Sequence, residues 1–316
     1  MTATAQPHPP PDPDPVTDHD SPWKEALEGW FPEFLALLFP AIHAEIDWSR
    51  GHRFLDKEFQ QIVRDAKTGR RYADKLVSVH RRDGRPAWVL VHVEVQGAPE
   101  AAFAERMFVY NHRIRDTHGV PVASLAVLAD SDARFRPGRY QDSLWGCAID
   151  FRFPIAKLLD WDSPERWRRL EASENVFALV VMAQIRAKAT QDAETRKAWK
   201  FRLMRLMYDR GYDRAVILDL FRIIDWMIRL PEGLEAAFRE EFYAFEEGRH
   251  MPYVTTVERA GIRKGEAQLL LWQIEKKFGA ESAQANRPRV EAAESQTLRT
   301  WSERILSATT LDAVFH

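Results

Sequence analysis

The sequence predicts an α/β core followed by an all-helical region, and three observations support this prediction. Residues 87–96 have the two-residue period of a β-strand, with valines at 89, 91, 93 and 95 on one face, and an apolar stretch at 76–79 precedes them. A helical apolar period over residues 99–117 then separates the second strand from a nearly continuous apolar run at 120–129. After about residue 160 the apolar spacing is helical. The order strand, helix, strand indicates a crossover helix between strands of one sheet.

Composition limits the classes of protein to consider. The chain has 316 residues, 45% of them hydrophobic, and a net charge of -2, so any nucleic-acid-binding surface must be a local basic patch. The single cysteine, Cys147, excludes disulfides and thiolate zinc sites within one chain. We expect it to be a small core residue, and the count fits a reducing compartment.

Residues 1–20 contain six prolines and almost no apolar side chains, which predicts a disordered tail. They also lack the basic and apolar regions of a signal peptide. No apolar run approaches the roughly 20 residues that span a bilayer. We therefore expect a cytoplasmic protein without a membrane partner.

Turn and cap residues set the expected element boundaries. Asp83-Gly84 indicates a hairpin between the first two strands, and Gly119 is a suitable stop for the helix at 99–117. A helix is expected over 55–66, before the hairpin. Further helices are expected at 175–187, 194–208, 214–230, 264–278 and 298–306, with a looser segment at 246–261. The expected organisation is a tail at 1–20, an α/β domain at 21–160, a helical region at 161–250 and a C-terminal helical domain at 251–316.

The candidate chemistry lies on the predicted hairpin. Asp74 begins the first strand, and Glu94 and Gln96 come late in the second, so a tight turn brings Asp74 and Glu94 to the same end. Two converging carboxylates repel each other unless they share a cation or a proton. Mg²⁺ prefers such oxygen ligands and activates water, which suits phosphodiester hydrolysis. The alternative is that Asp74 caps a turn and Glu94 is a solvated strand residue.

Several segments together resemble the Rpn family, the recombination-promoting or transposase-like nucleases of the PD-(D/E)XK type. They are the stretches at 54–58, 72–77, 91–97, 104–110 and 120–128, which occur in this order within residues 20–160. The resemblance implies a mixed central sheet flanked by helices, as in restriction endonucleases. It also implies a metal-dependent endodeoxyribonuclease that uses Mg²⁺, which Mn²⁺ can replace, and that acts on DNA in recombination.

The resemblance also implies roles for individual residues. Asp74 and Glu94 would bind the metal, the backbone carbonyl of Val95 would add a ligand, and Glu58 matches an accessory helix acid. Gln96 stands where the wider superfamily usually has lysine, so it supplies hydrogen bonds instead of a cation, although glutamine is common here within the family.

Three supporting residues have two interpretations each. His92 tunes the metal shell or, as we favour, packs within its strand. Arg106 and Tyr110, one helical turn apart, brace the site or contact a phosphate, or they make a structural hydrogen bond.

The helical half offers two further hypotheses. Between residues 196 and 214 seven basic residues alternate with aromatic ones, so Arg196, Lys197 and Lys200 are candidate DNA contacts. We favour the alternative of an ordinary amphipathic helix. Residues 265–312 resemble a helical domain of unknown function that often follows such nuclease cores. A homodimer through this C-terminal region is a further hypothesis.

Two other functions stay open at this stage. The chain can be a nuclease-fold protein with weak or lost activity that acts as a DNA- or protein-binding module. It can also be a helical structural protein whose α/β part is a scaffold, in which case Asp74 and Glu94 lie far apart.

Overall fold

The computed structural model describes residues 22–59, 75–94 and 102–315, without the side chains of residues 92–94, 256 and 260. Contacts divide the chain into two compact units. The first comprises residues 1–211 and 222–231, and the second comprises 212–221 and 232–316. The first unit thus continues well past residue 160, where the sequence suggested the end of a domain.

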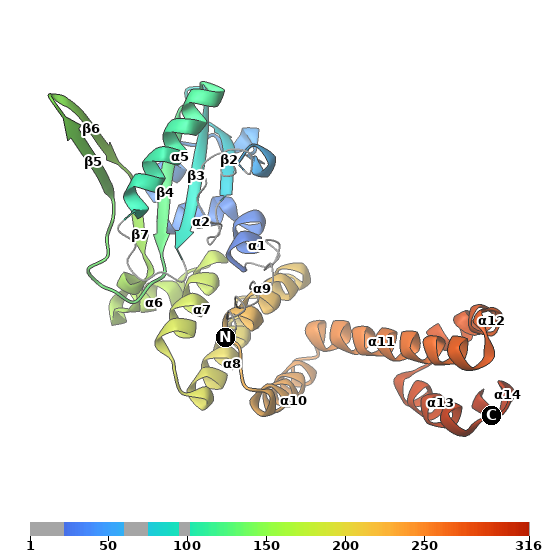
Figure 1. Ribbon diagram of the computed structural model, residues 1–316. Coiled ribbons are helices and arrows are strands. Elements are labelled where there is room, and N and C mark those ends of the chain that lie inside the picture. The colour runs from blue at the N-terminus through green and yellow to red at the C-terminus, as the bar shows by residue number, and fades with distance from the viewer. Residues whose placement is uncertain (1–21, 60–74, 95–101, 316) are drawn as a thin grey trace, which may run out of the picture. The chain divides into compact units, whose positions relative to one another are not determined.

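A five-stranded mixed sheet forms the centre of the first unit, in the order β1-β2-β3-β4-β7 (Figure 1). The strands are β1 (Arg53–Phe54), β2 (Lys75–His80), β3 (Pro86–Glu94), β4 (Val122–Leu128) and β7 (Ile155–Lys157). β1, β2 and β3 pair antiparallel, whereas β3, β4 and β7 are parallel. The expected α/β class and the crossover helix are therefore confirmed.

Local sequence explains the hairpin and the crossover. Gly84 has a φ of 83° in the turn between β2 and β3, which a residue without a Cβ adopts without strain. Helix α5 (Phe103–His118) links β3 to β4 and ends at Gly119, whose φ of 65° is a left-handed C-cap. The apolar stripe of α5 that the sequence predicted is buried against the sheet and consists of Phe103, Met107, Tyr110 and Ile114.

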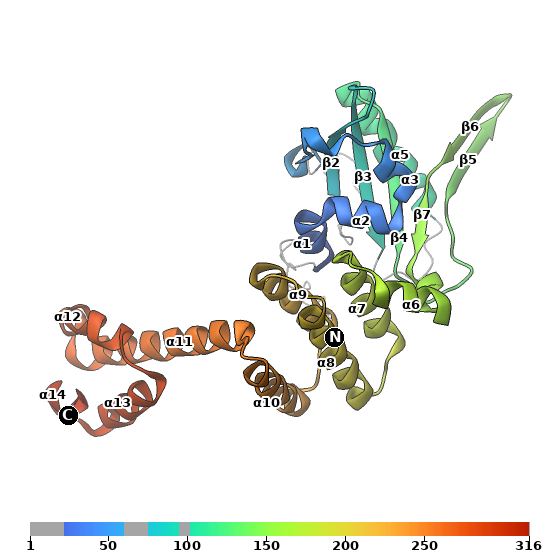
Figure 2. The ribbon, with the colours of Figure 1, turned by 180° about the vertical axis from the view of Figure 1, so that it is seen from behind.

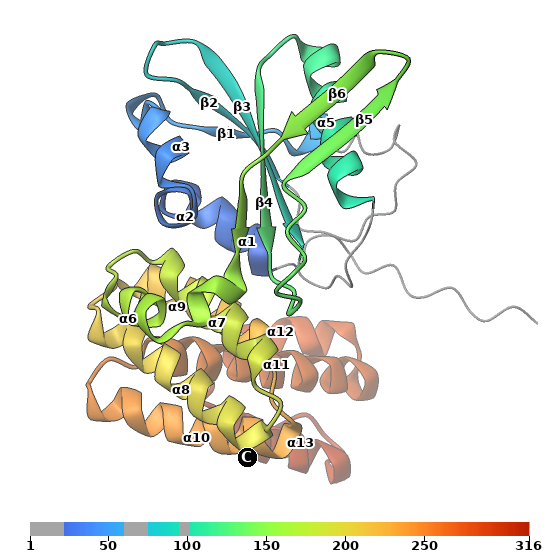
Figure 3. The same cartoon turned by 90° about the vertical axis from the view of Figure 1, so that its left-hand side faces the viewer.

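The sheet is covered on both faces. Tyr110 and Ile114 of α5 pack with Leu76 and Leu90 on one face. Helices α1 (Pro22–Gly29), α2 (Phe31–Leu38) and α3 (Pro40–Glu45) lie on the opposite side of the sheet from α5 (Figures 2 and 3). This double cover explains why the apolar run of β4 is continuous, since Leu125 to Leu128 are fully buried.

The remaining helices of the first unit pack against this layer through α7 (Phe177–Ala189). Every residue from Phe177 to Ile185 is buried, so this part of α7 is covered on all sides, as expected of a central helix. The indole of Trp23 donates a 2.9 Å hydrogen bond to Gln184, and the Phe34 and Phe177 rings lie 5.2 Å apart. The elements next to α7 in the chain are η2 (Leu158–Asp162) and α6 (Pro164–Ala172) before it and α8 (Ala193–Asp209) after it, whereas η1 (Trp48–Arg50) follows α3.

A separate two-stranded hairpin, β5 (Arg139–Leu144) and β6 (Cys147–Arg152), extends beyond the sheet beside α5 (Figure 1). A strand was expected here, but Cys147 was expected in the core and that prediction was wrong. Cys147 is exposed because it lies at the outer end of the hairpin, where no other layer covers it.

The second unit is helical and has a core of its own. α11 (Tyr253–Phe278), α12 (Ala280–Glu291), α13 (Ser295–Ser307) and α14 (Asp312–Phe315) enclose an apolar cluster that includes Leu270, Ile274, Leu298 and Trp301. α10 (Glu232–Gly248) precedes them, and the boundary between the units passes through α9 (Arg214–Met227). α11 begins earlier than the sequence suggested, because the buried carboxylate of Glu246 accepts the backbone N–H groups of Val254 and Thr255.

Within the described ranges, we find no helix with the length and apolar character needed to span a bilayer.

Candidate functional site

The candidate site lies at the edge of the sheet where the parallel strands end. Glu94 is the last residue of β3 and pairs with Leu128, which in turn pairs with Lys157 at the end of β7. β2 begins at the same edge, because its first residue, Lys75, pairs with Val91. Carboxyl ends of parallel strands commonly form ligand sites in α/β proteins.

The residues predicted to bind metal are described only in part. Asp74, Val95 and Gln96 lie outside the described residues, and Glu94 and His92 are described by their backbone alone. Asp74 directly precedes Lys75 in the sequence, and the described strand β3 runs three residues beyond Val91 to Glu94. Where the backbone is described, it therefore has the hairpin register on which the prediction depends.

Glu58 lies on an element that packs against this hairpin. A helical turn begins at Asp56, and Phe59 of this turn is buried, together with the preceding Leu55, against Leu76 and Leu90 of the sheet. Glu58 itself is half-buried. The packing fixes the start of this helix close to β2.

The two predicted supporting residues on α5 differ in their surroundings. Tyr110 is buried in the core, where its ring meets that of Phe59 edge to face at 5.9 Å. The Arg106 guanidinium lies over the Phe103 ring, 5.5 Å from its centroid. Tyr110 therefore contributes to core packing. Arg106 lies one turn nearer the N-terminus of the same helix and stacks on Phe103.

Sequence reasoning missed an ion cluster at the start of β2. The Lys75 side chain is only 6% exposed, and its ammonium group lies 3.1 Å from Asp56 and forms a hydrogen bond with Glu28. A buried cation with two carboxylate partners links α1, the start of the helix at Asp56 and the first residue of β2. This cluster fixes the backbone immediately after Asp74. A lysine directly before the apolar residues Leu76 and Val77 of a predicted strand was the available signal.

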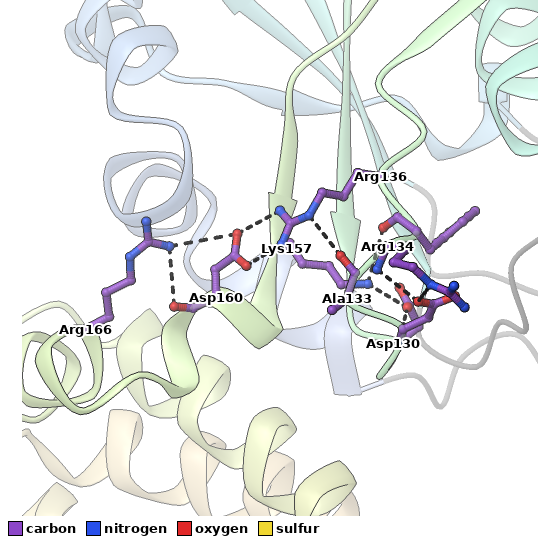
Figure 4. A network of polar contacts seen from close by, with 9 residues as sticks. Asp130, Ala133, Arg134, Arg136, Lys157, Asp160 and Arg166 are labelled. Carbon is purple, nitrogen blue, oxygen red and sulfur yellow. Dashed lines mark hydrogen bonds and ion pairs between the residues drawn. The ribbon is translucent and has the colours of Figure 1, made fainter.

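A second missed cluster lies at the ends of β4 and β7 (Figure 4). The Lys157 ammonium is fully buried and lies 2.6 Å from Oδ1 of Asp130, which is itself only 3% exposed. The backbone N–H of Asp132 donates a 2.9 Å hydrogen bond to the same carboxylate. Oδ2 of Asp130 is buried and has no hydrogen-bond partner in the described part of the chain.

Figure 4 also shows a solvent-facing extension of this cluster. The guanidinium of Arg136 forms two hydrogen bonds with Asp160, one of them 2.9 Å long, and that of Arg166 lies 3.9 Å from the same carboxylate. The Arg136 hydrogen bond holds the pKa of Asp160 below its ordinary value. Arg136 and Arg166 therefore stabilise the anionic form of Asp160.

The side chains at this edge bear on which metal ion could bind. No group of three or more His, Cys, Asp or Glu side chains able to hold a metal occurs in residues 22–59, 75–94 and 102–315. The donors at this edge are carboxylate oxygens, which Mg²⁺ prefers, and Oδ2 of Asp130 is a buried acceptor without a partner. The donor chemistry therefore suits a hard cation.

The predicted DNA-contacting helix requires one correction. Lys200 is fully buried, and its ammonium lies 2.7 Å from Asp225, so its charge is not available to a phosphate. Arg196 is half-buried and donates a 2.8 Å hydrogen bond to the carbonyl of Ala187. Lys197 is half-buried. The apolar residues Leu203, Met204 and Met207 are buried, as the amphipathic-helix alternative predicts.

No protein-family model, no curated protein and no solved structure matches this chain.

Proposed function

We propose that the chain is a Mg²⁺-dependent DNA endonuclease of the recombination-promoting, PD-(D/E)XK type. One observation carries the proposal. The antiparallel β2–β3 hairpin and the parallel β3–α5–β4 crossover share one sheet edge, and Glu94 ends β3 at that edge. This is the arrangement of elements that the resemblance implies.

The proposed roles follow from the chemistry of the side chains. Asp74 and Glu94 hold the cation, the carbonyl of Val95 adds an oxygen, and Glu58 assists from the neighbouring helix. Gln96 orients the attacking water or the phosphate through hydrogen bonds. When bound, Mg²⁺ polarises a phosphate oxygen and lowers the pKa of a bound water. The Lys75 cluster supports the site because it holds the backbone next to Asp74.

Cleavage of plasmid and linear DNA in Mg²⁺, compared with EDTA, tests the proposal. Asp74→Ala and Glu94→Ala should each lower the rate by about 100-fold or more, since losing a metal ligand removes several kcal/mol of transition-state stabilisation. Glu165→Ala is a matched control. It removes an exposed carboxylate that pairs with Arg169 on its own helix, so the rate should not change. Parent-like cleavage by both site variants would show that the site is assigned wrongly.

Gln96 favours a second candidate, a binding module with the same fold and no turnover, because glutamine lacks the cation that lysine places near the scissile phosphate. Thermal unfolding with Mg²⁺ or Mn²⁺ separates the two candidates. A cation that binds the folded chain raises Tm, and Asp74→Ala should abolish that shift. DNA or protein binding without cleavage, and with no metal-dependent shift in the parent, would favour the binding module.

A further inference from the structure

The hairpin formed by β5 and β6 has one polar and one apolar face. The pairs Tyr140–Phe151, Asp142–Ile149 and Leu144–Cys147 share one face, because paired residues project to the same side of a sheet. At the base, Tyr140 and Phe151 pack on Phe108 of α5, with ring centroids 5.2 and 5.8 Å apart. Towards the tip nothing in the described chain covers this face, since Leu144 is 62% and Ile149 37% exposed.

Trp145 at the tip is 95% exposed and has a φ of 50°. It forms a two-residue turn with Gly146, whose φ is 89°. Asparagine or glycine adopts this left-handed conformation at lower cost than tryptophan. Neither the local backbone nor burial within the chain therefore explains a tryptophan here.

An isolated two-stranded ribbon is marginally stable in water, and unpaired strand edges beside exposed apolar side chains promote aggregation. A partner that binds only occasionally would leave this face uncovered for most of the time. A second copy of the chain is always present at matching concentration, so it can cover the face permanently.

Charge and area agree with a protein partner. The apolar face of the hairpin carries Asp142 and no basic residue, and the arginines of the opposite face, Arg139 and Arg152, both bond to Asp150. Such a ribbon offers no free cation to a nucleic-acid backbone. Two copies of Trp145 would bury roughly 300–500 Å². The exposed parts of Leu144 and Ile149 in each copy add to this area, and a stable interface buries about 1,600 Å² in total.

We infer that the β5–β6 hairpin is a dimerisation arm, whose apolar face and Trp145 pack against a second copy of this chain. The hairpin is a different dimer surface from the C-terminal helices, which the sequence suggested. The inference does not depend on nuclease activity.

Sedimentation or light scattering of the full chain over a range of concentrations tests the inference. The parent should have twice the 36.7 kDa chain mass. Trp145→Asn should weaken the dimer by about 30-fold or more, as for a central interface aromatic. Asn-Gly is the preferred sequence for this turn, so loss of dimer in Trp145→Asn does not reflect a damaged hairpin.

Adjacent residues of β6 provide a matched pair of variants. Ile149→Lys inserts a charge on the apolar face and should also give monomer, whereas Ala148→Lys inserts the same charge on the polar face and should leave the dimer intact. Alkylation of Cys147, the single thiol, should slow as the parent dimer forms. A monomeric parent, a dimer unaffected by Trp145→Asn and Ile149→Lys, or a dimer whose Cys147 reacts as fast as the monomer's would each overturn the inference.

Discussion

The buried ion pair between Lys157 and Asp130 predicts a large and unequal response to substitution. Lys157→Met keeps the length of the side chain and leaves the Asp130 carboxylate buried without its cation. Both groups are at most 3% exposed and lie 2.6 Å apart. Removing one member of such a pair costs about 3–5 kcal/mol, and the lower end applies here because the N–H of Asp132 still serves the carboxylate.

A loss of about 3 kcal/mol corresponds to roughly a 150-fold change in the folding equilibrium. The double variant Lys157→Met with Asp130→Asn has no stranded charge and should recover more than half of that loss. Because the chain has two units, urea unfolding is best followed by hydrogen exchange of peptides from β4 and β7, so that the transition measured belongs to the first unit. Equal destabilisation of the single and double variants would refute the electrostatic reasoning and leave lost packing as the cause.

Two further predictions concern surface features. The pKa of Asp160 is lowered by Arg136, so their hydrogen bonds stabilise the folded state above the ordinary value of 3.8 and this stability is lost as the pH falls through the lower folded-state value. Arg136→Gln should therefore lower the unfolding free energy only slightly at pH 7, since both side chains reach solvent, and the difference from the parent should shrink as the pH falls below the ordinary value of 3.8; a difference independent of pH would contradict this. Gly119→Ala should lose about 1 kcal/mol because φ is 65° there, although a Cβ would meet no atom within 4 Å. Gly265→Ala, in the exposed interior of α11, should instead gain about 0.5–1 kcal/mol in denaturant unfolding of the second unit, and a change of the same sign at both glycines would argue against a conformational cause.

The sequence by itself determined the local architecture of the first unit. Periods of 2.0 and 3.6 residues depend on short-range backbone geometry, so β3, α5 and β4 could be predicted in order. Gly84 and Gly119 adopt a positive φ, which places the turn after β2 and the end of α5. The candidate edge follows from the same logic, because a hairpin register needs only its turn and its alternation.

Only the tertiary structure decided which charges are buried and which apolar residues are exposed. Lys157 and Asp130 are 27 residues apart and Lys75 and Glu28 are 47 apart, so no local pattern connects them. Lys200 appeared to be a surface cation, but it is buried beside Asp225. Cys147 appeared to be a core residue, but it lies on a hairpin that leaves the sheet. Burial depends on which segments fold back over a residue, and this is a property of the whole chain that spacing along the sequence does not contain.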